Sequence, residues 1–180
     1  METKSLQESA SRDVEVAECS EVMPRVFVYG IGNPGRQDDG LGPLLAERLE
    51  GWVESEGLSD IKVDANYQLM AEDAHTVSEH DLVIFADASK EDIPSYAVSR
   101  VEASSHIGFS THSMTAESVV GLTSELYGTP PPVYMIHIKG YEWDYAAEMT
   151  EQALENLNQV EQFLREWLKN PVEIQTPITV

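Results

Sequence analysis

Residues 26–40 have the sequence VFVYGIGNPGRQDDG, in which a strand gives way to a helix through a glycine-rich turn. The first four residues are β-branched or aromatic and favour a β-strand, and Gly32 permits the sharp turn that follows. Across residues 41–53, apolar side chains recur at helical spacing, which predicts an amphipathic helix. Asp38 and Asp39 therefore lie where the loop ends and the helix begins.

Further along the chain, apolar runs of strand composition alternate with segments of helical periodicity. We expect strands at residues 61–63, 82–86, 96–101 and 133–139, and helices at residues 68–74, at residues 116–126 and from Thr150 onward. This alternation predicts an α/β fold, a three-layer αβα sandwich around a mostly parallel sheet of about five strands. Thr111 or Ser113 is expected to cap the helix that contains Ala116.

Length and composition suit one globular domain. The chain has 180 residues, of which 42% are hydrophobic, and single domains commonly span about 100–200 residues. Residues 1–22 are polar and acidic without an apolar block, so we expect a disordered lead-in there. Residues 23–169 then form a single α/β domain, and residues 170–180 form a C-terminal tail without regular structure.

Charge and cysteine content indicate which classes of partner the protein can bind and in which cellular compartment it is expected. With 11 basic and 32 acidic side chains the net charge is −21, which disfavours nucleic acids and anionic membranes as partners. No apolar stretch reaches the ~20 residues that cross a bilayer. Cys19 is the single cysteine, so the chain can form neither an internal disulfide nor a thiolate zinc site. We therefore expect a cytoplasmic protein.

Three side chains could meet at one edge of the predicted sheet, because the carboxyl ends of parallel strands share an edge. Asp39 follows the first strand, Asp64 follows the second, and His112 precedes a later helix. Two carboxylates and an imidazole suit a divalent metal ion with open coordination positions. Taken singly, each has a more ordinary explanation: a helix cap for the aspartates at 38 and 39, a turn for Asp64, and a hydrogen-bonded loop for His112.

Two further residues have open roles. Asp87 ends the buried strand at residues 82–86, where it could cap a turn or accept a hydrogen bond that orients a ligand. His137 lies between two isoleucines on a predicted strand, which favours a core or lining position. A serine or cysteine protease triad is not supported, because the chain has no Gly-x-Ser-x-Gly motif and Cys19 falls in the lead-in.

The spacing Gly30-x-Gly32-x-x-Gly35 matches the dinucleotide-binding fingerprint. In that fingerprint, free amides at a helix N-terminus meet a pyrophosphate. Here Pro34 removes an amide, and carboxylates stand where the phosphates would lie. Nucleotide binding is therefore disfavoured.

The segment Gly30-Ile31-Gly32-Asn33, followed by Asp38-Asp39-Gly40-Leu41-Gly42, resembles the maturation endopeptidases of nickel-iron hydrogenases. The resemblance continues through Phe85-Ala86-Asp87-Ala88 and Thr111-His112-Ser113 and covers residues 26–168. It implies a protease without a stored metal, which recognises nickel in the hydrogenase large-subunit precursor and removes that subunit's C-terminal extension.

The same resemblance implies roles for individual residues. The family's metal contacts are two acids and a histidine, which correspond here to Asp39, Asp64 and His112. The family often has Glu at the first position, and the spacing after Asp64 differs by about one residue, so Gln68 is an alternative contact to metal or substrate. The surrounding loop and supporting residues are Gly32, Asn33, Asp38 and Asp87. The nickel belongs to the substrate, and zinc or cadmium could take its place in a crystal.

Two other functions stay open at this point. Residues 30–35 also resemble peptidyl-tRNA hydrolase, but that family's tyrosine and His-Asn pair are missing here, and a charge of −21 opposes tRNA binding. A non-cleaving chaperone for the hydrogenase precursor is the third possibility. The polar outer face of the last helix favours a monomer.

Overall fold

The computed structural model describes residues 23–104, 114–174 and 176–180. The expected lead-in at residues 1–22 lies outside this range, as does His112. The elements in chain order are β1 (Val26–Ile31), the 3-10 turn η1 (Gln37–Gly40), α1 (Leu41–Glu56), β2 (Ile61–Asn66), α2 (Asp73–Ser78), β3 (Leu82–Ser89), β4 (Tyr96–Arg100), α3 (Ala116–Tyr127), β5 (Val133–Lys139), α4 (Glu151–Lys169) and β6 (Ile178–Thr179).

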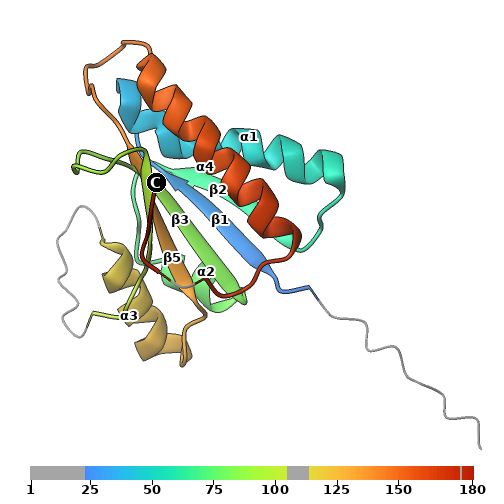
Figure 1. The fold of residues 1–180 in the computed structure, drawn as a ribbon. Coiled ribbons are helices and arrows are strands. Elements are labelled where there is room, and N and C mark those ends of the chain that lie inside the picture. Colours follow the sequence, from blue (N-terminus) through green and yellow to red (C-terminus); the bar gives the residue numbers. More distant parts are fainter. Residues whose placement is uncertain (1–22, 105–113, 175) are drawn as a thin grey trace, which may run out of the picture.

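One sheet of six strands runs through the described part of the chain, in the order β2-β1-β3-β5-β4-β6. Figure 1 labels the four strands β2, β1, β3 and β5 of this sheet. The strands β2, β1, β3 and β5 are mutually parallel, whereas β4 and β6 are antiparallel to their neighbours. The predicted mostly parallel αβα sandwich is thus confirmed, with one strand more than expected.

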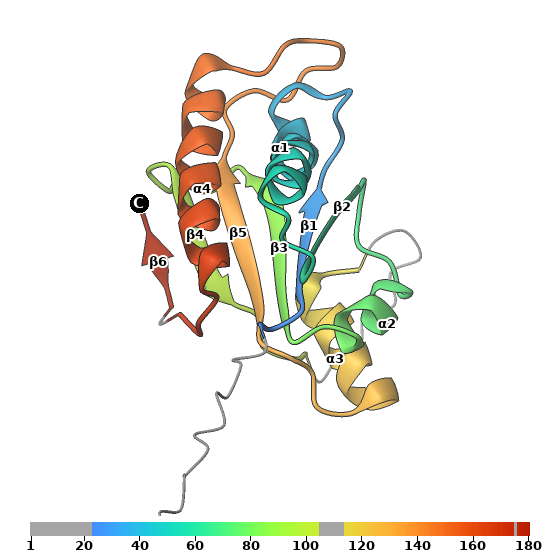
Figure 2. The ribbon, with the colours of Figure 1, turned by 90° about the vertical axis from the view of Figure 1, so that its right-hand side faces the viewer.

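Helices cover both faces of this sheet (Figure 2). α1 and α4 pack together on one face, over a core that contains the fully buried Leu45 and Leu164. α2 and α3 pack together on the other face, where alternate residues of β1 and β3, such as Phe27 and Phe85, form a second core. Residues one position apart on a strand therefore belong to different cores, as the twofold alternation of strands requires.

One predicted helix start and one predicted helix cap are wrong. The expected helix at residues 68–74 begins instead at Asp73, because Leu69 is held in an extended bridge with Met114. The cap of α3 is Thr115 and neither Thr111 nor Ser113: Thr115 is extended, and its hydroxyl oxygen accepts a hydrogen bond from the Ser118 amide at 3.2 Å. Thr111 and Ser113 lie outside the described residues.

The C-terminal segment contributes structure that its sequence did not indicate. Ile178 and Thr179 pair with β4 as the short strand β6. The segment before it is held by an ion pair between Arg100 and Glu173. No helix in the described part of the chain has the length and apolar composition needed to span a bilayer.

Candidate functional site

The carboxyl ends of the parallel strands bring a row of side chains together on the face covered by α2 and α3. Asn66 of β2 pairs with Ile31 of β1, and Asp87 of β3 pairs with His137 of β5. Gly30 of β1 pairs with Ala86 of β3, so the next residues, Ile31 and Asp87, lie level with each other. Asn66, Ile31, Asp87 and His137 therefore form a row across four adjacent strands. α3 does not cover this end of the sheet completely, and Asp87 and His137 are only half-buried.

A cavity of about 400 Å³ opens over this row. Its base is apolar and includes Ile31, Leu69 and Met135. The polar and charged side chains that line it include Gln68, Asp87, Arg100, Thr115, Glu117 and His137. Concave sites with an apolar base and a few convergent polar groups are the usual form of ligand and substrate sites.

Asp87 is the titratable group in this cavity with the largest perturbation. Burial raises the pKa of its carboxyl group from 3.8 to about 6, the hydrogen bond from the Ala88 amide opposes that rise, and the negative charge of Asp39 adds to it. The amide of Ala88 lies 2.8 Å from Oδ1 of Asp87. The turn η1, which carries Asp39, contacts β3, which carries Asp87.

The turn after β1 places Asp39 at this edge. Gly32 has a φ of +139°, and a side chain there would overlap the carbonyl oxygen of Asp39. Glycine is therefore required, both for the backbone conformation and for the close approach. Asn33 shapes the same turn, because its Oδ1 accepts a hydrogen bond of 2.9 Å from the Gly35 amide. Asp39 itself is half-buried.

Asp38 has a different environment from its neighbour. It is completely buried, and its carboxylate accepts hydrogen bonds from the amides of Tyr141, Glu142 and Thr150 and from the Thr150 hydroxyl, at 2.8 to 3.0 Å. It thus fixes the loop between β5 and α4 and the first residues of α4. Both carboxylate oxygens of Asp38 accept hydrogen bonds from this loop and from Thr150. Its role is therefore structural.

Asp64 is set back from the row. It pairs with Tyr29, two residues before the end of β2, so it lies roughly 7 Å back from the carboxyl edge of the sheet. It is also two strands away from Asp87, a spacing of roughly 10 Å across the sheet. It is exposed, its Oδ1 accepts a hydrogen bond from the Ala65 amide at 2.8 Å, and it borders a separate cavity of about 220 Å³ beside α1. Its side chain lies on the same face of the sheet as that of Tyr29. Burial raises the pKa of Tyr29, and the negative charges of Asp73 and Asp64 add to that rise.

Gln68, the alternative to Asp64, lines the cavity together with Asp87. It is half-buried, and its amide nitrogen donates to the sulfur of Met70 at 3.4 Å. The structure thus brings Asp39, Asp87 and Gln68 to one edge and leaves Asp64 outside it, while His112 is not among the described residues. Within residues 23–104, 114–174 and 176–180, no three His, Cys, Asp or Glu side chains gather as a metal centre.

His137 was expected to be a core or lining residue, and it does line the cavity. Its position beside Asp87 was not anticipated. The signal was present in the sequence, because a histidine that interrupts an apolar parallel strand falls in register with the polar end of the neighbouring strand. Finding it requires the order β3-β5, which sequence periodicity does not supply.

Comparison with known proteins identifies the fold. No protein-family model matches the sequence, and no curated protein matches it either. Among solved structures, the chain is similar to the NiFe hydrogenase maturation protease HycI from Thermococcus kodakarensis KOD1, with 24% identity over 81% of this chain and 93% of that one and a TM-score of 0.64.

An endopeptidase from Escherichia coli, at 18% identity, matches over 86% of this chain and 97% of its own, with a TM-score of 0.60. The hydrogenase maturating endopeptidase HybD from E. coli, at 17% identity, covers the same shares with a TM-score of 0.56. Because almost the whole length of each of these proteins is matched, the chain has the complete fold seen in hydrogenase maturation proteases.

Proposed function

We propose that this protein is an endopeptidase that removes the C-terminal extension from a nickel-iron hydrogenase large-subunit precursor. The observation that carries the proposal is that the turn holding Asp39 contacts β3, whose Asp87 lines a cavity at the carboxyl end of the sheet, in a fold shared with solved hydrogenase maturation proteases. We expect it to act as a monomer in the cytoplasm.

Nickel enters this proposal as part of the substrate. Asp39 and His112 would contact the nickel seated in the precursor, with Gln68 or Asp64 as the third contact. The position of Gln68 in the cavity beside Asp87 favours Gln68 over the more distant Asp64. An amide oxygen is a suitable ligand for a borderline divalent ion, although it carries no charge.

Such an arrangement needs no nucleophilic side chain. A divalent metal can polarise a peptide carbonyl and lower the pKa of a water molecule. This chain would supply the carboxylate of Asp39, a hydrogen-bond acceptor at Asp87 that orients a ligand or a water, and a cavity that holds the polypeptide on either side of the bond to be cut. The described cavity of about 400 Å³ is large enough for a few side chains of an extended segment.

The test is a processing assay with purified precursor loaded with nickel, read as a mass shift of the large subunit. Wild-type protein is expected to release the extension, and Asp39→Asn is expected to stay folded and to release none. Gln68→Ala is expected to slow processing more than Asp64→Asn does. Asp60→Asn, an exposed substitution before β2 at the opposite end of the sheet, is the matched control and should process normally.

Two results would contradict separate parts of the proposal, the role of Asp39 and the peptidase activity itself. Full processing by Asp39→Asn would remove Asp39 from the reaction. A stable complex with the loaded precursor that never yields a mass shift would instead indicate a chaperone without peptidase activity.

A further inference from the structure

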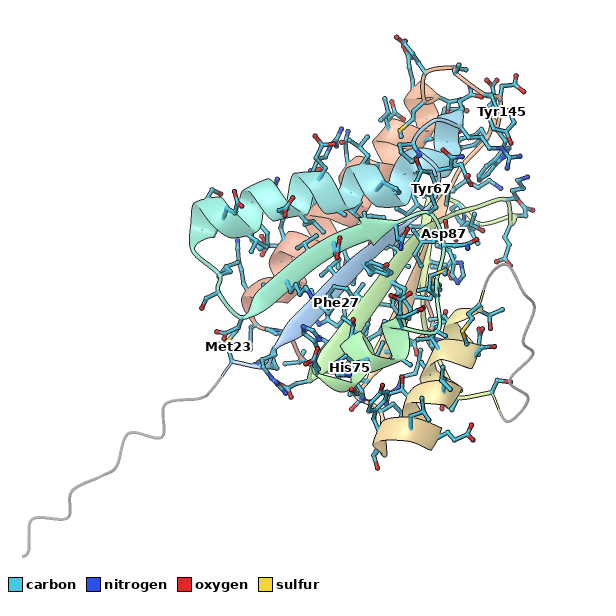
Figure 3. All side chains as sticks on the ribbon, turned by 180° about the vertical axis from the view of Figure 1, so that it is seen from behind. Met23, Phe27, Tyr67, His75, Asp87 and Tyr145 are labelled. Atoms are coloured by element: carbon cyan, nitrogen blue, oxygen red, sulfur yellow. The ribbon has the colours of Figure 1, made fainter. Side chains whose placement is uncertain are left out.

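Two large aromatic side chains are exposed beside the cavity. Tyr67 is 65% exposed and Tyr145 is 74% exposed, and Figure 3 shows both at the end of the sheet that carries Asp87, away from Met23 at the other end. Burying apolar surface is worth about 25 cal/mol per Å². A partner surface that buries these two tyrosine rings would therefore gain binding free energy.

These rings belong to a continuous strip. Tyr67 lines the main cavity and also lines a smaller one, of about 190 Å³, together with Pro34. Two residues further along the same turn, the guanidinium carbon of Arg36 lies 5.5 Å from the centre of the Tyr145 ring. We call Tyr67, Pro34, Arg36 and Tyr145 the aromatic strip.

The strip is ordered before any partner binds. The Ala146 amide donates to the Gly35 carbonyl at 3.0 Å, and Arg36 Nε donates to the Trp143 carbonyl at 3.0 Å. The buried carboxylate of Asp38 fixes both ends of the same loop. A preformed surface loses little conformational entropy on association, and tyrosine offers a large contact area for few rotatable bonds.

Charge indicates the chemistry of the surface that would cover the strip. Glu142, Asp144 and Glu148 surround Tyr145 in sequence and are exposed, and the chain carries a net charge of −21. A complementary surface has an apolar centre for the rings and lysine or arginine at its rim. Nucleic acid does not meet this requirement.

We infer that the aromatic strip docks the folded body of the precursor, while the precursor's C-terminal segment runs past Tyr67 into the cavity. Tyr67 belongs to the strip and also lines the cavity. A segment that enters the cavity would therefore bring the protein it belongs to into contact with Pro34, Arg36 and Tyr145. This inference rests on the proposed function, because it takes the cavity to be the site of the segment that is cut.

The experiment measures both binding and cleavage of the nickel-loaded precursor. Tyr145→Ala is expected to raise the Kd and the KM by about ten- to a hundredfold, the range of aromatic hot spots, with kcat within twofold of wild type. Tyr127→Ala is the matched control, since Tyr127 is 50% exposed at the end of α3, and it should change neither constant. A synthetic peptide with the sequence of the extension should bind Tyr145→Ala and wild type equally.

The outcomes separate this inference from the proposed function. If wild type cleaves and Tyr145→Ala has an unchanged KM and Kd, the docking surface is wrong and the peptidase stands. If wild type binds the precursor without cutting it and Tyr145→Ala weakens that binding, the surface is supported and the peptidase is wrong. Equal loss of binding in Tyr145→Ala and Tyr127→Ala, or loss of peptide binding in Tyr145→Ala, would overturn the docking surface.

Discussion

The two faces of the sheet are covered to different extents. α1 and α4, with 16 and 19 residues, shield one face along its whole length and bury Leu41, Leu157 and Leu164 completely. α2 and α3 have 6 and 12 residues and leave the carboxyl end of the other face open, where Asp87 and His137 line the cavity. The closed face therefore contains a more completely buried core, and the open face carries the cavity.

Asp38 and Asp39 show the same division between adjacent residues. Asp38 joins η1 to the loop before α4 through a fully buried carboxylate, whereas Asp39 is half-buried and influences Asp87. Identical side chains thus have different environments, because the short 3-10 turn buries Asp38 and leaves Asp39 partly exposed.

The largest effect is expected for Asp38→Ala. The substitution leaves the amides of Tyr141, Glu142 and Thr150 without their acceptor in a buried position, so the free energy of unfolding should fall by about 3–5 kcal/mol. Urea denaturation measures it, with Asp39→Ala as the control, which should change stability by less than about 1 kcal/mol. Equal effects of the two substitutions would contradict the division between them.

A pair of core substitutions compares the two faces directly. Leu164→Ala, on the closed face, removes a fully buried side chain and should lower the free energy of unfolding by about 2–4 kcal/mol. Met135→Ala, under the cavity on the open face, is only half-buried and should lower it by about 1–2 kcal/mol, since solvent can fill the space. Urea denaturation of both variants tests this order, and a larger loss for Met135→Ala would reverse the assignment of stability to the closed face.

The carboxyl group of Asp87 should lower the free energy of unfolding of the protein as pH rises. Its carboxyl pKa is about 6 in the folded protein, against an ordinary 3.8, so the folded state holds that proton more tightly than the unfolded state. The associated stability is fully present below pH 3.8 and is lost as pH rises through 6. Asp87→Asn avoids this loss, and at pH 7 it should be more stable than wild type by about 1–3 kcal/mol.

Urea midpoints measured for wild type and Asp87→Asn from pH 4 to pH 7 test this dependence. The two curves should separate progressively over that interval. Asp60→Asn, an exposed substitution at the opposite end of the sheet, should run parallel to wild type. A constant difference between wild type and Asp87→Asn at every pH would show that the ordinary pKa persists in the folded state.

The sequence was sufficient for the parts of the molecule that depend on local pattern. The apolar run before Asp87 indicated a strand buried on both faces, and β3 is that strand. The turn after β1 was predictable because glycine spacing and the following helical stripe agree. The separation of Asp38 from Asp39 was not predictable, since it depends on Tyr141 and Thr150, more than a hundred residues away.

Other errors have the same physical origin. Gln68 was placed at a helix start because residues 68–74 have helical composition, but a tertiary bridge between Leu69 and Met114 keeps that segment extended. The strand in the tail could not be predicted, because a strand of two residues, such as β6, leaves no periodic signal in the sequence. In both cases a partner distant in sequence decided the backbone conformation.

The smallest effect on the free energy of unfolding is expected from removing the cap of α3, a helix that covers the open face of the sheet. Thr115→Ala removes the acceptor of the Ser118 amide and should lower the free energy of unfolding by about 1 kcal/mol. Ser113→Ala, at one of the two positions that the sequence offered as caps, should have no comparable effect if Thr115 alone caps the start of the helix. Thr115 also lines the cavity, so Thr115→Ser, which keeps the acceptor oxygen, separates capping from any effect on processing. This variant should have the stability of wild type. A processing defect that persists in Thr115→Ser would show that the methyl group of Thr115 contributes to the shape of the cavity.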